Sequence, residues 1–323
     1  MSKLIRFFMG VSLILVSLGC FFYPDLKNMD VKKEVQDIEE KIEIQDSDSR
    51  EEDLQREDKN KNKEALYQEM KKYNQELALE GQELVDVWSY EDLPVNFKNL
   101  TEENSVVGYI EIPDMMVELP LLVGASEDNL AKGAGILSET SMPVGGEDTN
   151  CVIAAHRGWK GSTYFQYIEN MLPGSKVYVH TLWETREYEA VEIKIVDAHD
   201  LDSILIKQGK DMITLMSCHP YGIPGGNLRY LVYCEYVEKA EVQEIKDEEQ
   251  EKEKEKKEEL VYASGQEIKS SKEWIRWENR IRYILPGIVM LYFLFLYIKN
   301  KWKSVIIVGI TTVYSDNGER SVV

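Results

Sequence analysis

Between Ser105 and Val237 the sequence is divided into short apolar runs that alternate with proline, glycine and other turn residues. Runs of this length with turn signals between them predict β-strands. The predicted strands are Val106–Ile112, Val117–Val123, Ala134–Leu137, Asn150–Ala155, Lys176–His180, Arg186–Val196, Met212–Ser217 and Leu228–Val237. Strands this short and numerous, with only brief helical interruptions, predict one mostly antiparallel domain, either a sandwich or a closed barrel.

The segments on either side of this domain are strongly charged. Asp30–Lys59 carries 13 acidic and 6 basic residues, and a second charged run extends from Glu238 to Glu259. Neither segment has enough apolar surface to fold alone, so both are predicted to be solvated linkers or exposed helices. The net charge of −20 argues against a nucleic-acid partner, because phosphates are bound by basic surfaces.

Both ends of the chain are apolar. Phe7–Tyr23 is uncharged and follows Lys3 and Arg6, which predicts a membrane span or an uncleaved signal anchor with the following chain outside the cell. Tyr283–Ile298 is a predicted second span. The sequence therefore predicts a protein of the cell membrane, with its middle domain on the extracytoplasmic face.

A helix is predicted before the strands, because apolar residues from Leu66 to Leu77 recur at helical spacing and Gly81 can end it. The predicted organisation is a membrane anchor at 1–24, an acidic stalk at 25–62, a helix and connection at 63–104, the β-domain at 105–237, a charged linker at 238–275 and a C-terminal membrane region at 276–323.

The cysteines and histidines show neither a disulfide framework nor a zinc site. No two cysteines form a C-x-x-C pair, and no histidine cluster has the spacing of zinc ligands. We therefore expect no metal and no cofactor. The residues concerned are Cys20, Cys151, Cys218, Cys234, His156, His180, His199 and His219.

Three chemically useful residues lie at the ends or beginnings of predicted strands. Cys218 follows the run Met212–Ser217, His156 follows Asn150–Ala155, and Arg229 begins the last strand. Because side chains alternate between the two faces of a strand, these three can converge on one face. The same alternation sends Cys151 and Cys234 to the opposite face, where they are predicted to be core residues, and turns His219 away from the site.

These residue types suit acyl transfer through a thioester. A thiol with an ordinary pKa is mostly protonated at neutral pH, and a nearby histidine can take its proton. Arginine stays charged and can stabilise an oxyanion. The competing interpretations are a buried apolar Cys218, a core histidine and a surface arginine.

The motifs around these residues resemble those of the sortase family, specifically the class C, pilus-type group. Thr214–Cys218 resembles the T-L-x-T-C signature with Ser217 as its fourth residue, and His219–Gly222 resembles the continuation T-P-Y-G. The other matching segments are Ala155–Gly158, Asn227–Val232, Gly108–Pro113, Leu119–Pro120, Thr140–Gly146 and Tyr73–Ala78.

This resemblance implies an eight-stranded sortase-type barrel and three site roles. Cys218 would be the nucleophile, His156 the acid and base, and Arg229 the group that stabilises the oxyanion or the substrate backbone. The implied substrate is an LPXTG-like sorting signal, and the implied acceptor is a lysine of a pilin subunit. A housekeeping enzyme that uses a cell-wall peptide amine as acceptor is the alternative within the family.

The sequence departs from the class C pattern at two places. The insert Pro224–Gly226 lengthens the turn between Cys218 and Arg229, which bears on the shape of the substrate groove. Class C enzymes often carry an aspartate-proline-aromatic lid, and Asp86 and Trp88 keep its outer two residues. We hypothesise that these two form a degenerate lid, the alternative being a packed tryptophan.

Two alternatives lie outside the family. An L,D-transpeptidase also uses cysteine and histidine on a β scaffold, but it places arginine soon after the cysteine, where Pro220 and Tyr221 stand here. A non-catalytic, membrane-anchored surface domain predicts that Cys218, His156 and Arg229 do not converge.

Overall fold

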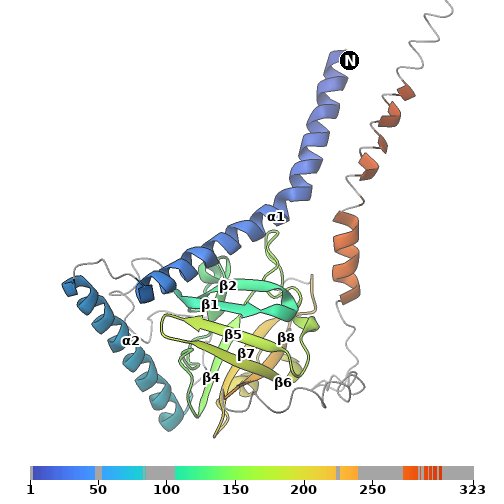
Figure 1. Ribbon diagram of the computed structural model, residues 1–323. Coiled ribbons are helices and arrows are strands. Elements are labelled where there is room, and N and C mark those ends of the chain that lie inside the picture. The colour runs from blue at the N-terminus through green and yellow to red at the C-terminus, as the bar shows by residue number, and fades with distance from the viewer. Residues whose placement is uncertain are drawn as a thin grey trace, which may run out of the picture. The chain divides into compact units, whose positions relative to one another are not determined.

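In the computed structural model, the described residues are 3–47, 53–82, 84, 106–222, 226–238, 272–282, 284, 287–289, 291–292, 294–296 and 298–299. They belong to two compact units, one made of Met1–Pro24 and Glu273–Val323 and the other of Asp25–Lys272. The second unit holds a closed barrel of eight strands (Figure 1). The strands are β1 Val106–Ile112, β2 Val117–Val123, β3 Ala134–Ile136, β4 Thr149–Ala154, β5 Lys176–Thr181, β6 Thr185–Asp197, β7 Asp211–His219 and β8 Leu228–Tyr236.

The strand order around the barrel is β1-β2-β3-β4-β7-β8-β6-β5. The pairs β2–β3 and β4–β7 are parallel, and the others are antiparallel. The prediction of a closed, mostly antiparallel barrel is therefore confirmed. β7 runs further than predicted, through Cys218 to His219, so the thiol is carried by the strand itself.

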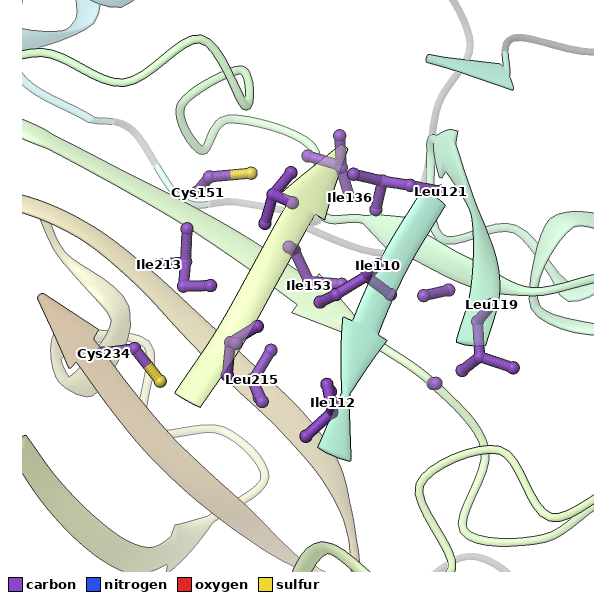
Figure 2. Packing of buried hydrophobic residues seen from close by; sticks show 14 of the residues in the cluster. Ile110, Ile112, Leu119, Leu121, Ile136, Cys151, Ile153, Ile213, Leu215 and Cys234 are labelled. Atoms are coloured by element: carbon purple, nitrogen blue, oxygen red, sulfur yellow. The ribbon is translucent and has the colours of Figure 1, made fainter. Parts of the chain in front are cut away.

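One face of the barrel wall points into the interior and forms the main core. Figure 2 shows isoleucine and leucine side chains from several strands meeting there, with Cys151 of β4 and Cys234 of β8 among them. Both cysteines are almost fully buried. The prediction that these two cysteines are core residues is confirmed.

The outer face of β4, β7 and β8 carries a second apolar cluster. Val152, Ala154, Met216, Leu231 and Tyr233 belong to it, and each is the kind of alternate residue that strand parity assigns to that face. Two short helices cover the cluster, α3 Glu127–Leu130 through Leu130 and η3 Asp202–Ile204 through Ile204. The remaining short helices are η1 Pro113–Met115 and η2 Ile168–Asn170.

Helix α2, Asp53–Glu80, begins before the predicted start at Lys63. On its predicted apolar face, Leu66 and Met70 are buried in the core and Tyr73 packs against it partly buried. The Asn74 side chain accepts a hydrogen bond from the Met142 backbone nitrogen at 2.7 Å and donates one to the Met142 carbonyl at 3.1 Å. The helix ends at Gly81, as predicted, where a φ of 86° favours glycine.

Helix α1, Lys3–Ser47, includes most of the predicted acidic stalk. Val35 and Ile38 are buried and pack against Tyr109 of β1. Apolar residues at a spacing of three are enough to dock one helix face, although the surrounding residues are charged. This part of the stalk is therefore a helix packed on the barrel through Val35 and Ile38, where the charge pattern predicted a solvated linker or an exposed helix.

Among the described residues, the helix Lys272–Leu296 is long and apolar enough to cross a membrane. It overlaps the predicted second span at Tyr283–Ile298. The predicted first span, Phe7–Tyr23, lies within the helical residues of α1, and its membrane insertion stays a prediction. Residues 300–323, at the end of the predicted C-terminal membrane region, lie outside the described residues.

Candidate active site

Cys218 and Arg229 are direct neighbours across two antiparallel strands. Cys218 is the penultimate residue of β7, and it is paired in register with Arg229 of β8. Residues directly opposite each other in an antiparallel pair project to the same face of the sheet. Strand pairing thus places the side chains of Cys218 and Arg229 on the same outer face of the barrel.

His156 reaches the same place from the other side of β7. Ala154 of β4 is paired with Met216 in parallel, and the Ala155 nitrogen donates to the Met216 carbonyl at 3.2 Å. His156 lies two residues after Ala154, and Cys218 lies two residues after Met216, so the two residues come side by side. The structure therefore brings all three predicted site residues together, in a cavity of about 280 Å³ that is also lined by Leu130, Ala154, Ala155, Met216 and Ser217.

The imidazole of His156 is held by aromatic neighbours. It stacks on Trp159 with ring centroids 4.5 Å apart, and Tyr164 approaches edge-on at 6.3 Å. Burial lowers the pKa of His156, and the charge of Glu127 opposes part of that effect. The ring is therefore neutral at pH 7 and can accept a proton.

The described cysteines have very different surroundings. Cys218 is partly exposed in the cavity, whereas Cys151 and Cys234 are buried. Burial raises the pKa of both interior thiols far above the usual range, because an apolar interior disfavours the thiolate. Of these three thiols, Cys218 alone lines the cavity and can react with a solute.

Arg229 is anchored at the beginning of β8. Its Nη1 donates to the carbonyls of Gly226 and Leu228 at 2.8 and 3.0 Å. These bonds hold the guanidinium against the backbone where β8 begins. Residues 223–225, which include part of the predicted insert, lie outside the described residues.

A group of buried polar residues behind the cavity escaped the sequence reasoning. Arg157 and Glu169 form a buried ion pair, and Arg157 also contacts His219. Alternation correctly turned His219 away from the cavity, but its burial at 1% exposure was not predicted. The available signal was the position of Arg157, which follows His156 directly and therefore faces the same side as His219.

The predicted lid residues Asp86 and Trp88 lie outside the described residues. The chain leading to them is tied to the barrel. Gln82 donates to the Glu139 carbonyl at 2.9 Å and accepts from the Ile206 nitrogen at 2.7 Å, and Leu84 packs on the outer cluster.

In the parts of the chain that the structure describes, no three His, Cys, Asp or Glu side chains gather closely enough to hold a metal ion. The groups of the cavity that can act chemically include the Cys218 thiol, the His156 imidazole and the Arg229 guanidinium.

The known proteins that this chain resembles are sortases. The sortase domain model matches residues 110–237. Sortase D of Bacillus subtilis (strain 168) is 29% identical over 133 residues, which cover 41% of this chain and 64% of that protein. Sortase A of Staphylococcus aureus (strain NCTC 8325 / PS 47) is 32% identical over 123 residues, covering 37% and 58%. The chain thus spans less than two thirds of the length of these curated relatives.

The crystal structure of Streptococcus pneumoniae sortase C has a TM-score of 0.50 and 30% identity to this chain, and the match covers 64% of this chain and 97% of that one. Sortase A of Corynebacterium diphtheriae also has a TM-score of 0.50, with 28% identity and coverage of 54% and 84%. Because the pneumococcal enzyme is matched over nearly its whole length at that identity, and the family model matches the barrel that carries the cavity, the chain belongs to the sortase family.

Proposed function

We propose that this chain is a cysteine transpeptidase that cleaves an LPXTG-like sorting signal and transfers the acyl group to an amine. The observation that supports this most is the single cavity lined by Cys218, His156 and Arg229. A nucleophile, a base and an oxyanion donor within one cavity are the parts that acyl transfer requires.

In the first half of the reaction, His156 takes the proton of the Cys218 thiol, and the sulfur attacks the threonine carbonyl carbon. Arg229 stabilises the negative oxygen of the tetrahedral intermediate. The carbon–nitrogen bond to the next residue then breaks, and the proton held by His156 passes to the leaving amine. The product is a thioester on Cys218.

In the second half, an acceptor amine attacks the thioester carbonyl. His156 removes a proton from the amine, the carbon–sulfur bond breaks, and the sulfur recovers a proton from His156. The new bond is an amide, so no oxidant or energy source is needed. The lowered pKa of His156 suits this role, because a neutral imidazole can remove a proton from the attacking amine.

We propose that the acceptor is a lysine of a pilin subunit. The Streptococcus pneumoniae sortase C, matched here over 97% of its length, has a pilin substrate specificity. The membrane region also supports the assignment, because the C-terminal helix Lys272–Leu296 can hold the enzyme at the cell membrane. We place the barrel on the extracytoplasmic face, where Lys3 and Arg6 before the first span would leave it.

A second candidate is a housekeeping enzyme that attaches surface proteins to a cell-wall peptide amine. Its support is the likeness to the sortase A proteins of Staphylococcus aureus and Corynebacterium diphtheriae. The two candidates differ in the acceptor and share the thioester.

The test uses the full-length chain in detergent micelles with peptides bearing LPXTG variants. We expect mass spectrometry to find a thioester on Cys218, and none in Cys218→Ala. A lysine-bearing pilin fragment and a cell-wall peptide, supplied separately, then identify the acceptor. An intact wild-type protein that forms no adduct with any variant peptide would refute the transpeptidase assignment.

A further inference from the structure

Each of the three cavity residues is followed directly in the sequence by a residue that faces the other side of the barrel wall. These followers are Arg157, His219 and Tyr230. They meet in one buried cluster. Arg157 Nη1 lies 2.9 Å from His219 Nδ1, and the Tyr230 ring centroid lies 5.7 Å from the Arg157 guanidinium carbon and 5.9 Å from the His219 ring centroid. The cavity residues are thus backed by a second set of contacts between the same three chain segments.

One guanidinium connects these segments. Arg157 Nη1 donates to the backbone carbonyl of Cys218 at 3.1 Å and is also bonded to His219 Nδ1. Arg157 Nη2 pairs with Glu169, the middle residue of η2. The Arg157 and Glu169 side chains are 3% and 5% exposed. The residue after His156 is therefore bonded to the main chain of the proposed nucleophile.

The protonation states of the cluster follow from its charges. Burial and, to a smaller extent, the charge of Arg157 lower the pKa of His219 to about 4, although Glu169 opposes the shift. His219 is then neutral at pH 7 and accepts the hydrogen bond from Arg157. One cation and one anion remain, so the cluster carries no net charge.

Overall stability is a poor explanation for such a pair. Removing two charges from water costs about as much as their attraction returns, and apolar residues of similar volume are often as stable or more so. A planar guanidinium with several fixed donors does, however, hold its partners at defined distances and angles. The Arg157–Glu169 pair is therefore better explained by the positions in which it holds its partners than by stability.

We propose that Arg157 is a positioning residue, which holds the Cys218 carbonyl so that the thiol and His156 keep their reactive separation, while Glu169 and His219 orient its guanidinium. The inference rests on the proposed function. Arg157 faces away from the cavity and touches no reacting atom, so it acts through Cys218 and His156. Displacing two reacting groups by about 1 Å can cost on the order of 100-fold in rate.

The test measures thioester formation from an LPXTG-type peptide by the full-length chain in detergent. The main variant is Arg157→Met/Glu169→Leu, which replaces the ion pair by apolar side chains and leaves no buried charge unpaired. We expect it to unfold at a temperature close to that of the wild type, with kcat for acylation lowered on the order of 100-fold and KM nearly unchanged. Iodoacetamide alkylates a thiol without requiring the alignment of thiol, His156 and leaving amine that acylation requires. The rate at which it alkylates Cys218 should therefore stay within about threefold of the wild-type rate.

A matched pair at His219 keeps the test decisive if the double variant fails to fold. His219→Asn retains an acceptor close to the position of Nδ1, whereas His219→Leu removes it. We expect His219→Leu to lose kcat on the order of 10-fold, and His219→Asn to recover most of that loss.

Two results would overturn this inference and leave the proposed function standing. One is a folded double variant with wild-type kcat, and the other is His219→Leu and His219→Asn acting at equal rates, both in an assay where the wild type forms the thioester. If the wild type forms no thioester, the proposed function fails and this inference fails with it.

Discussion

Cysteines on the inner and outer faces of the same barrel wall differ in their surroundings and in their expected reactivity. Cys151 and Cys234 point inward, are nearly fully buried, and have strongly raised pKa values. Cys218 points outward into a cavity beside His156 and Arg229. The difference arises from strand parity, since one step along a strand exchanges the closed interior of the barrel for the partly exposed wall of the cavity. The reactivity of a cysteine in this barrel is therefore set by the face of the wall on which it lies.

The largest expected effect comes from removing the outer thiol. Cys218→Ala should abolish thioester formation, because no other described thiol lines the cavity. Cys151→Ala and Cys234→Ala should still form the thioester, with a loss of stability on the order of 1 kcal/mol from the small cavity left inside. Mass spectrometry of the acylated protein and thermal unfolding measure the two effects. Thioester formation in Cys218→Ala would contradict the comparison.

The next effect concerns the outer guanidinium. Arg229→Gln should lower kcat by about 10² to 10³, because one donor to the developing oxyanion is lost. Arg229→Lys keeps the charge without the planar fork and should fall between Arg229→Gln and the wild type. Single-turnover acylation gives kcat and KM separately. If Arg229→Gln raised KM and left kcat unchanged, Arg229 would hold the substrate backbone instead.

The inner face should dominate the pH dependence of stability. The pKa of folded His219 is about 4, whereas an unfolded histidine titrates near 6.5, so the unfolded chain binds the proton first as the pH falls. The free energy of unfolding should therefore decrease between about pH 7 and pH 4, by about 3 kcal/mol for this group, and level off below pH 4.

Denaturant unfolding of the wild type and His219→Asn at several pH values measures the share of His219. The free energy of unfolding should change less steeply with pH in the variant. Part of the pH dependence should remain, because burial also lowers the pKa of His156. An identical slope in the two proteins would show that His219 is not buried in its neutral form.

The smallest effect compares one substitution on the two faces. Cys234→Ser places a hydroxyl in the apolar interior and should cost about 1–3 kcal/mol of the free energy of unfolding. Cys218→Ser changes a partly exposed side chain and should stay within about 0.5 kcal/mol of the wild type. Equal costs at the two positions would contradict the difference in burial between Cys234 and Cys218.

Much of the fold could be predicted from the sequence, because short apolar runs with turn residues between them favour few architectures. The eight strands were predicted nearly at their observed bounds, and alternation correctly separated Cys218 from Cys151 and Cys234. The docking of α1 was missed, since Val35 and Ile38 stand among charged residues and only their contact with Tyr109 reveals a buried face.

By itself, the sequence determined the strands, the face on which each side chain lies, and the residues that we propose for acyl transfer. These are local properties that follow from a period of two and from side-chain chemistry. Only the tertiary structure decided that Cys218 pairs with Arg229 and that Arg157, Glu169 and His219 meet behind them. Register and charge pairing join residues that are distant in the sequence, so they are set by the closure of the whole barrel.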